Sequence, residues 1–303
     1  MALGRIGTYA VFQSTIKDMS NAQNELIRLQ TQISSGLKSQ NYAGIADQTE
    51  QFLDLENKIS KTDLYIKNNR VVKTRLEVTS TSLDQIVETA NSLKNLIATR
   101  RSGTQGELST FRAQLTDMWQ TIAAQLNVSS EGRYLFSGTS TDVKPVDANQ
   151  FPRLSTLGVP DDGYYSGSNE DIIIRAQEDI EFTYNIRADN PAFQKIIAGL
   201  STALEGDEGS SDVNLAAAYD FVDEGLRDVI TLQASVNANK VAIDEIDSQH
   251  QSFKLYWQGV KEDIGNTDLV AASTQVALNQ GILQAAFQAY ARINSLRLSD
   301  FLQ

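Results

Sequence analysis

The sequence predicts a mainly α-helical protein whose N- and C-terminal halves form a long antiparallel bundle or coiled coil, with a small β insert in the middle. Two observations carry this prediction. Apolar residues recur every three or four positions through long stretches at both ends of the chain. Between residues 139 and 190, by contrast, lie three of the four prolines, frequent turn signals and β-branched runs. Because two helical halves flank one insert, we expect the chain to fold back on itself.

The first predicted helix carries an apolar stripe from Phe12 to Leu37 that includes Ile16. Between Met19 and Ile33 the steps alternate between three and four residues, which is the spacing of a coiled-coil seam. The helix should fade near the Ser-Ser-Gly step of residues 34–36 or continue weakly past it. Residues 39–45 (SQNYAGI) contain few helix formers and predict a turn.

A second, very long helix is expected over residues 47–101, with Asp47 as a possible N-terminal cap. Its stripe becomes polar in the middle, at Thr62, Asn69 and Lys73. Two explanations remain open. Either the register changes there and neighbouring valines take over, or the partner surface changes.

A third helix, over residues 108–126, should follow the break at residues 102–106. A tight aromatic loop comes next, formed by Arg133, Tyr134 and Phe136 at the base of the β insert. These three side chains could simply plug the base of the insert. Aromatic residues beside an arginine are equally typical of a contact hot spot.

Within the insert, residues 172–174 and 180–186 are rich in isoleucine and predict a hairpin. Helix should return at Pro191, a residue favoured in the first turn. After a loop at 205–211, another long helix is expected over about 213–260, with Phe253 and Trp257 on its inner side. The last helix should cover residues 267–302.

These elements predict five segments. Residues 1–45 form an N-terminal coiled-coil arm that pairs with a C-terminal arm, residues 262–303. Residues 46–138 and 191–261 form the two halves of the helical bundle, and residues 139–190 form the small β domain.

The terminal stripes need a partner surface, because ordering a helix of this length costs more entropy than burying one stripe recovers. Ordinary pairing within the chain is one explanation. The other is a mixture of such pairing and contacts between subunits. For the second we expect the contacts to be made by Leu26, Leu29, Ile33, Leu37, Leu283, Phe287, Tyr290, Leu296, Leu298 and Phe301.

Composition argues against several functional classes. A formal charge of −12 disfavours nucleic acid as a partner. The absence of cysteine removes thiol catalysis and thiolate metal sites. His250 is the only histidine and no phosphate-binding glycine motif is present, so we expect no catalytic, metal or cofactor site.

The sequence also makes membrane insertion unexpected, because it contains no run of 18 uncharged apolar residues. Residues 1–12 lack the compact apolar run of a signal peptide. If the protein leaves the cell, we expect a route that does not cleave such a peptide.

Four stretches resemble the bacterial flagellin family. Residues 29–37 (LQTQISSGL) are similar to its N-terminal signature, and residues 132–138 (GRYLFSG) to the loop after the third helix of its hook–filament junction branch. Residues 262–272 (EDIGNTDLVAA) resemble the acidic segment before its last helix. Residues 296–302 (LRLSDFL) resemble the ending of the junction branch.

The resemblance implies a non-enzymatic structural subunit of the extracellular flagellum, exported by the flagellar type III apparatus. Its implied partners are copies of itself, the first hook-associated junction protein, flagellin, and an export chaperone with the export apparatus. Residues 41–47 (NYAGIAD) depart from the flagellin pattern, and the Gln-Pro-Gln turn near the end of filament flagellins is missing. Both departures favour the junction branch. The alternatives are a flagellin that forms the filament itself and, from a different class, a coiled-coil secretion tip or adaptor protein.

Overall fold

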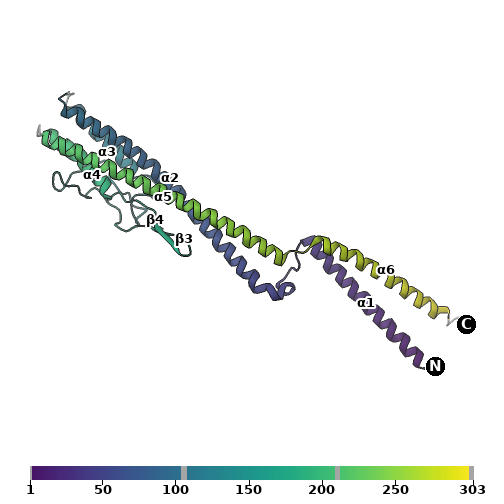
Figure 1. The fold of residues 1–303 in the computed structure, drawn as a ribbon. Coiled ribbons are helices and arrows are strands. Elements are labelled where there is room, and N and C mark those ends of the chain that lie inside the picture. Colours follow the sequence, from purple (N-terminus) through teal and green to yellow (C-terminus); the bar gives the residue numbers. More distant parts are fainter. Residues whose placement is uncertain (1, 104–107, 209–211, 300–303) are drawn as a thin grey trace. The chain divides into compact units, whose positions relative to one another are not determined.

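The computed structural model describes residues 2–103, 108–208 and 212–299 (Figure 1). These residues form two compact units. The terminal unit comprises the described parts of Met1–Ser60 and Phe253–Gln303, and the bundle unit is Lys61–Ser252. The predicted fold class is confirmed, because six α-helices and two small antiparallel strand pairs make up the described chain.

The bundle unit is built around four helices that share one apolar core. These helices are α2 (Thr49–Arg101), α3 (Leu108–Leu126), α4 (Pro191–Glu208) and α5 (Asp212–Gly265), with residues 61–101 of α2 and 212–252 of α5 in this unit. Each helix places residues of a 3.6-residue period inward. The fully buried residues include Leu83, Leu93, Leu115, Trp119, Ile196, Val222 and Val229.

Two glycines let α4 and α5 approach closely. A Cβ atom on Gly199 would lie 2.5 Å from Val222 Cγ2 and 2.8 Å from the Ala218 carbonyl oxygen. A Cβ atom on Gly225 would lie 2.7 Å from Ile196 Cγ1. Both helices therefore need glycine where their backbones meet, which offsets the cost of glycine inside a helix.

The β insert consists mostly of loops with two short antiparallel ribbons. The first pairs β1 (Ser129–Ser130) with β2 (Arg133–Tyr134), and the second pairs β3 (Ile173–Gln177) with β4 (Ile180–Thr183). Buried residues of the insert, such as Tyr184 and Ile186, belong to the same apolar core as the four helices. The insert is thus packed into the bundle unit.

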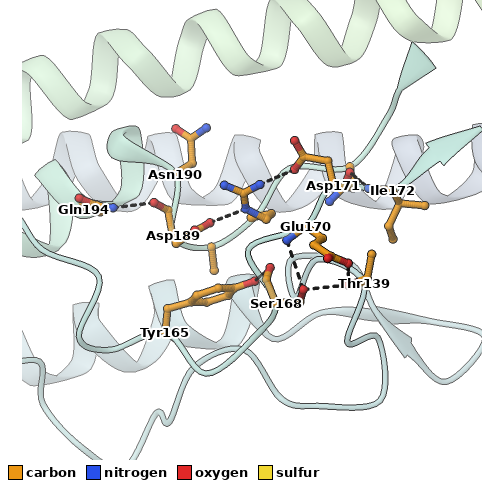
Figure 2. A network of polar contacts seen from close by, with 12 residues as sticks. Thr139, Tyr165, Ser168, Glu170, Asp171, Ile172, Asp189, Asn190 and Gln194 are labelled. Atoms are coloured by element: carbon orange, nitrogen blue, oxygen red, sulfur yellow. Dashed lines mark hydrogen bonds and ion pairs between the residues drawn. The ribbon is translucent and has the colours of Figure 1, made fainter. Parts of the chain in front are cut away.

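Polar contacts tie the insert to the start of α4 (Figure 2). The Arg187 guanidinium donates to Asp189 (2.9 Å) and to Asp171 (2.6 Å). The Gln194 side chain in the first turn of α4 donates to the Asp189 carbonyl oxygen (2.6 Å). The segment after β4, residues 184–190, and the helix α4 that follows it therefore share one hydrogen-bonded network.

The terminal unit contains the first and last helices, α1 (Ala2–Ser35) and α6 (Leu269–Ser299), which pack against each other. They run antiparallel, since Phe12 contacts Tyr290 while Leu37 forms a β-bridge with Asn266. The unit also holds the 3-10 helix η1 (Tyr42–Gln48), residues 49–60 of α2 and residues 253–265 of α5.

Four local predictions were wrong. The loop expected at residues 205–211 is helical as far as Glu208, where α4 ends. Asp47 does not cap α2, because it lies in η1 and α2 begins at Thr49. Ile16 lies outside the seam of α1, where the partly buried Thr15 takes its place. Phe253 does not face inward on α5 but is exposed, although its ring stacks on Trp257 at 5.6 Å.

The polar stretch of α2 has a structural cause. Thr62 and Asn69 are buried, and the Asn69 amide donates to the Ala176 carbonyl oxygen of the β3–β4 hairpin (3.2 Å). The partner surface changes there, which is one of the two explanations that the sequence left open. Val72 is buried as well, whereas Lys73 is only partly buried. Val72 therefore takes the place of Lys73 in the stripe, so the register change that the sequence also left open occurs here too.

Candidate assembly interface

The α1–α6 pair has a shallow seam. Its facing positions follow coiled-coil spacing on both helices. Among the described side chains of the two helices, only Leu29, Ala272 and Asn279 are buried. The other seam positions are partly exposed. They are Phe12, Thr15, Met19, Ala22, Leu26 and Ile33 on α1, and Val276, Leu283, Ala286 and Tyr290 on α6.

Backbone hydrogen bonds set the register of this pair. The Lys38 amide donates to the Gly265 carbonyl oxygen, and the Thr267 amide donates to the Gly36 carbonyl oxygen, each at 2.8 Å. Gly36 has a φ of +72°, a conformation that glycine adopts at little cost when it ends a helix. The Asp268 side chain then caps α6 by accepting the Val270 and Ala271 amides (2.9 and 3.0 Å).

Apolar side chains also occupy faces of α1 and α6 that point away from the seam. From Leu269 to Ala291, α6 carries no Asp, Glu, Lys or Arg. A solvated helix normally keeps its outer face charged. The exposed large apolar residues of the two helices are Ile16, Ile27, Leu269, Val270, Leu278, Ile282 and Phe287.

The structure distributes the residues expected at subunit contacts over both faces. Leu29 is buried in the seam, whereas Leu37 and Phe287 are exposed. Leu26, Ile33, Leu283 and Tyr290 are partly buried in the seam. The side chains of Leu296 and Leu298, and Phe301 as a whole, lie outside the described residues.

The side chains of the aromatic loop at the base of the β insert are divided between the core and the surface. Phe136 is fully buried and meets Phe193 of α4 edge-on, with ring centroids 6.0 Å apart. Arg133 is exposed and Tyr134 is partly exposed, both on strand β2. Phe136 is therefore a core residue that joins the insert to α4.

Sequence reasoning missed Ile27, Leu278 and Ile282 as candidate contacts, because they lie off the predicted stripes. A second signal could have found them. On α6, Leu278 and Ile282 lie within the stretch of residues 269–291 that lacks charge. Uncharged outer faces indicate surfaces that become buried. On α1, Ile27 lies on a face that the charged residues Asp18, Glu25 and Arg28 leave free.

Two partly buried tyrosines of the β insert have raised pKa values. Burial, together with the negative charge of Asp189, raises the pKa of Tyr165 to about 12. The same causes raise the pKa of Tyr164 well above its ordinary value. The Tyr164 hydroxyl donates to the Ala188 carbonyl oxygen (2.7 Å), which identifies it as a structural group of the insert.

The lone histidine has structural contacts. His250 Nε2 lies 3.0 Å from the Ala176 carbonyl oxygen, and its ring stacks on Tyr65 with centroids 5.5 Å apart. Within the described residues, no three His, Asp or Glu side chains gather closely enough to hold a metal ion. None of the described helices has the length and apolar character needed to cross a membrane.

Comparison with known proteins agrees with this architecture. Residues 6–141 match the model of the bacterial flagellin N-terminal helical region. The flagellar hook-associated protein 3 of Escherichia coli K12 is 21% identical over 321 residues, covering 97% of this chain and 98% of that protein. Residues 6–141 therefore resemble the helical region of bacterial flagellins. The hook-associated protein 3 of Salmonella typhimurium LT2 is 20% identical over 319 residues and again covers 97% of this chain.

Solved structures show that this chain shares its fold with hook-associated proteins. One structure, described as a flagellar hook-associated protein of Vibrio parahaemolyticus, gives a TM-score of 0.59 at 21% identity and covers 71% of this chain and 96% of its own. FlgL of Bacillus cereus gives a TM-score of 0.54 at 15% identity and covers 70% of this chain and 99% of its own.

Proposed function

We propose that this protein is a structural subunit that joins the flagellar hook to the filament. One observation carries the proposal, namely the exposed, charge-free surface of α6 between Leu269 and Ala291. Such a surface is costly in water and becomes favourable when neighbouring subunits cover it. Similarity over nearly the full length of two hook-associated proteins supports this place in the flagellum.

In this proposal, residues 1–45 and 262–303 act as paired assembly arms. Their shallow seam gives each subunit a preformed helix pair, and the outer faces of both helices make contacts with neighbours. The partners are further copies of the chain, the first hook-associated junction protein on one side and flagellin on the other. Export through the flagellar apparatus, with its chaperone, would deliver the chain outside the cell.

The test is electron microscopy of the purified chain, alone in concentrated sulfate and then with isolated hooks. Sulfate strengthens apolar burial and so promotes assembly. A junction subunit is expected to add a short, ordered layer at hook ends and to form no long filaments alone. Long filaments without hooks would instead identify a filament flagellin, and a small fixed oligomer that ignores hook ends would identify a tip or adaptor protein.

Replacing Phe287 with Asp should abolish incorporation at hook ends while leaving the chain folded. Phe287 is 45% exposed and lies outside the seam, so the carboxylate remains hydrated in the free subunit. In an assembly it would be buried without a partner. Circular dichroism checks the fold and microscopy measures incorporation. An unchanged yield of decorated hook ends contradicts the prediction.

A further inference from the structure

A second exposed apolar surface lies on α5, within the terminal unit. We call it the α5 outer face, and it is formed by Leu255, Tyr256 and Gly259. These residues are one turn or less apart on the same side of the helix. The side chains of Leu255 and Tyr256 are 69% and 67% exposed. Between residues 251 and 260 the only charged residue is the partly buried Lys254.

Gly259 is the observation that needs an explanation. Glycine inside a helix costs about 1 kcal/mol relative to alanine. At Gly199 and Gly225 this cost is offset, because α4 and α5 cross too closely there for a Cβ atom. Among the described residues, no atom beyond its chain neighbours and its own helix backbone lies within 4 Å of where a Cβ atom on Gly259 would stand. No close contact within this part of the chain therefore requires glycine at that position.

We propose that a helix of a second copy of this chain packs over Gly259, in contact with Leu255 and Tyr256. The chain already uses glycine for close helix crossings at Gly199 and Gly225. Gly259 is equally open to such a crossing, as is Gly281 of α6, and a second copy would supply the crossing helix. This contact rests on the proposed function in one respect only, namely that its partner is another copy of the chain.

Charge favours another copy meeting the chain at the terminal unit. Of the 26 basic and 38 acidic residues, 17 basic and 28 acidic ones lie in Lys61–Ser252, so the bundle unit carries −11 of the net charge of −12. Two bundle units repel each other. The terminal units are almost neutral and can approach with little electrostatic cost.

The outer face of α2 offers the complementary surface. In the terminal unit, Leu55 of α2 and Ile264 of α5 are buried, and Lys261 lies over the Phe52 ring (5.1 Å) and pairs with Glu56 (2.8 Å). The outer faces of the two helices therefore point away from each other. Leu53, with the exposed Asn57 and Ser60, forms the outer face of α2, which the exposed Glu50 borders at its N-terminal end.

Contact between two different faces gives a head-to-tail arrangement. The α5 outer face of one copy meets the α2 outer face of the next, which leaves one free face at each end. Such heterologous contacts build rings or helical assemblies, whereas a contact between identical faces stops at a dimer. A short layer of subunits in a tube requires heterologous contacts.

Sedimentation velocity of the full chain in concentrated sulfate tests the proposal. The wild-type chain should self-associate, and Gly259→Leu should weaken association by about tenfold or more, because its side chain fills the space of the crossing helix. Gly259→Ala should raise Tm by about 2 °C through helix propensity and still weaken association. Asn237→Ala, at an exposed position of α5 in the bundle unit, is the control and should leave association unchanged.

Mixing two variants tests the head-to-tail geometry. Gly259→Leu disrupts the α5 outer face and Leu53→Glu disrupts the α2 outer face, so each variant alone should associate about tenfold more weakly than the wild type. An equimolar mixture should form a one-to-one dimer through the two intact faces. A wild-type chain that stays monomeric, a Gly259→Leu chain that associates normally, or a mixture without dimers would each overturn the proposal.

The hook-end experiment separates this inference from the proposed function. A chain that decorates hook ends but fails these sedimentation tests overturns the α5 contact alone. A chain that passes them but ignores hook ends keeps the contact and overturns the junction role.

Discussion

At the scale of single residues, buried polar groups decide how the β insert joins the helices. Asn69 of α2 donates to the Ala176 carbonyl oxygen (3.2 Å) and to Asp247 of α5 (2.8 Å). The same carbonyl oxygen lies 3.0 Å from His250 Nε2. One peptide group of the β3–β4 hairpin is therefore bound by side chains of both long helices, which explains why the stripe of α2 is polar at this level.

Replacing Asn69 with Ala should destabilise the bundle unit by about 1–3 kcal/mol, because it leaves the Asp247 carboxylate without this amide donor and creates a small void. Urea unfolding followed by circular dichroism measures the change. The adjacent, exposed Asn68 provides the control, since Asn68→Ala should stay within about 0.5 kcal/mol. Equal effects of the two substitutions would show that the buried amide contributes nothing.

The tyrosines of the insert predict a pH dependence. The folded-state pKa of Tyr165 is raised to about 12, above the ordinary value of 10.0, so folding favours its protonated form. This contribution to stability is complete below pH 10 and is lost as the pH rises from 10 to about 12. Tyrosinate absorbance and unfolding temperature measured over that range test the expectation.

In Tyr165→Phe, the fall in unfolding temperature above pH 10 should be smaller, since this group no longer ionises. The variant should also be slightly less stable at neutral pH, by about 1 kcal/mol, because Tyr165 donates a hydrogen bond to the Ser168 carbonyl oxygen (2.8 Å). An unfolding temperature whose pH dependence matches the wild type would contradict the assignment.

At the scale of elements, α1 separates two kinds of apolar residue two positions apart. Leu29 is 4% exposed and holds the seam against α6, whereas Ile27 is 61% exposed on a different face. The helix period alone places them about 160° apart. One residue therefore stabilises the helix pair, and the other is available to a neighbouring subunit.

Leu29→Ala should loosen the α1–α6 pair by about 2–4 kcal/mol, while Ile27→Ala should change its stability by no more than about 0.5 kcal/mol. Hydrogen exchange of the α1 and α6 amides measures both effects in the free chain. Assembly at hook ends should be reduced by either substitution, through lost stability in one case and a lost contact in the other. Similar exchange rates in the two variants would contradict the division of α1 into two faces.

At the scale of the whole molecule, net charge is distributed unevenly between the two units. Nearly all of the excess negative charge belongs to Lys61–Ser252, and the terminal unit is close to neutral. Repulsion between bundle units opposes assembly, whereas apolar burial between terminal units favours it. Ionic strength should therefore shift the balance.

Raising NaCl from about 10 mM to about 150 mM shortens the screening length from roughly 30 Å to roughly 8 Å. Self-association of the chain should increase several-fold over this range, as measured by light scattering at constant protein concentration. A decrease would mean that attraction between opposite charges, and not apolar burial, holds the copies together.

Much of the fold followed from local sequence patterns. Helix positions, the central insert and the antiparallel return of the chain were predictable, because helical periodicity and turn chemistry act over a few residues. The Ser-Ser-Gly step correctly placed the end of α1 at Ser35, where Gly36 adopts its positive φ. The candidate contact surfaces were only partly predictable, since spacing identifies an apolar stripe but not the element that covers it.

The sequence by itself determined a helical chain with apolar stripes at both ends, an acidic middle and no charged residue from 269 to 291 of the last helix, because these properties belong to composition and period. Only the tertiary structure decided which apolar residues remain exposed. Phe136 is buried against α4, while Phe253 and Phe287 are exposed. Burial depends on which distant elements pack against a residue, and that packing is a property of the folded chain as a whole.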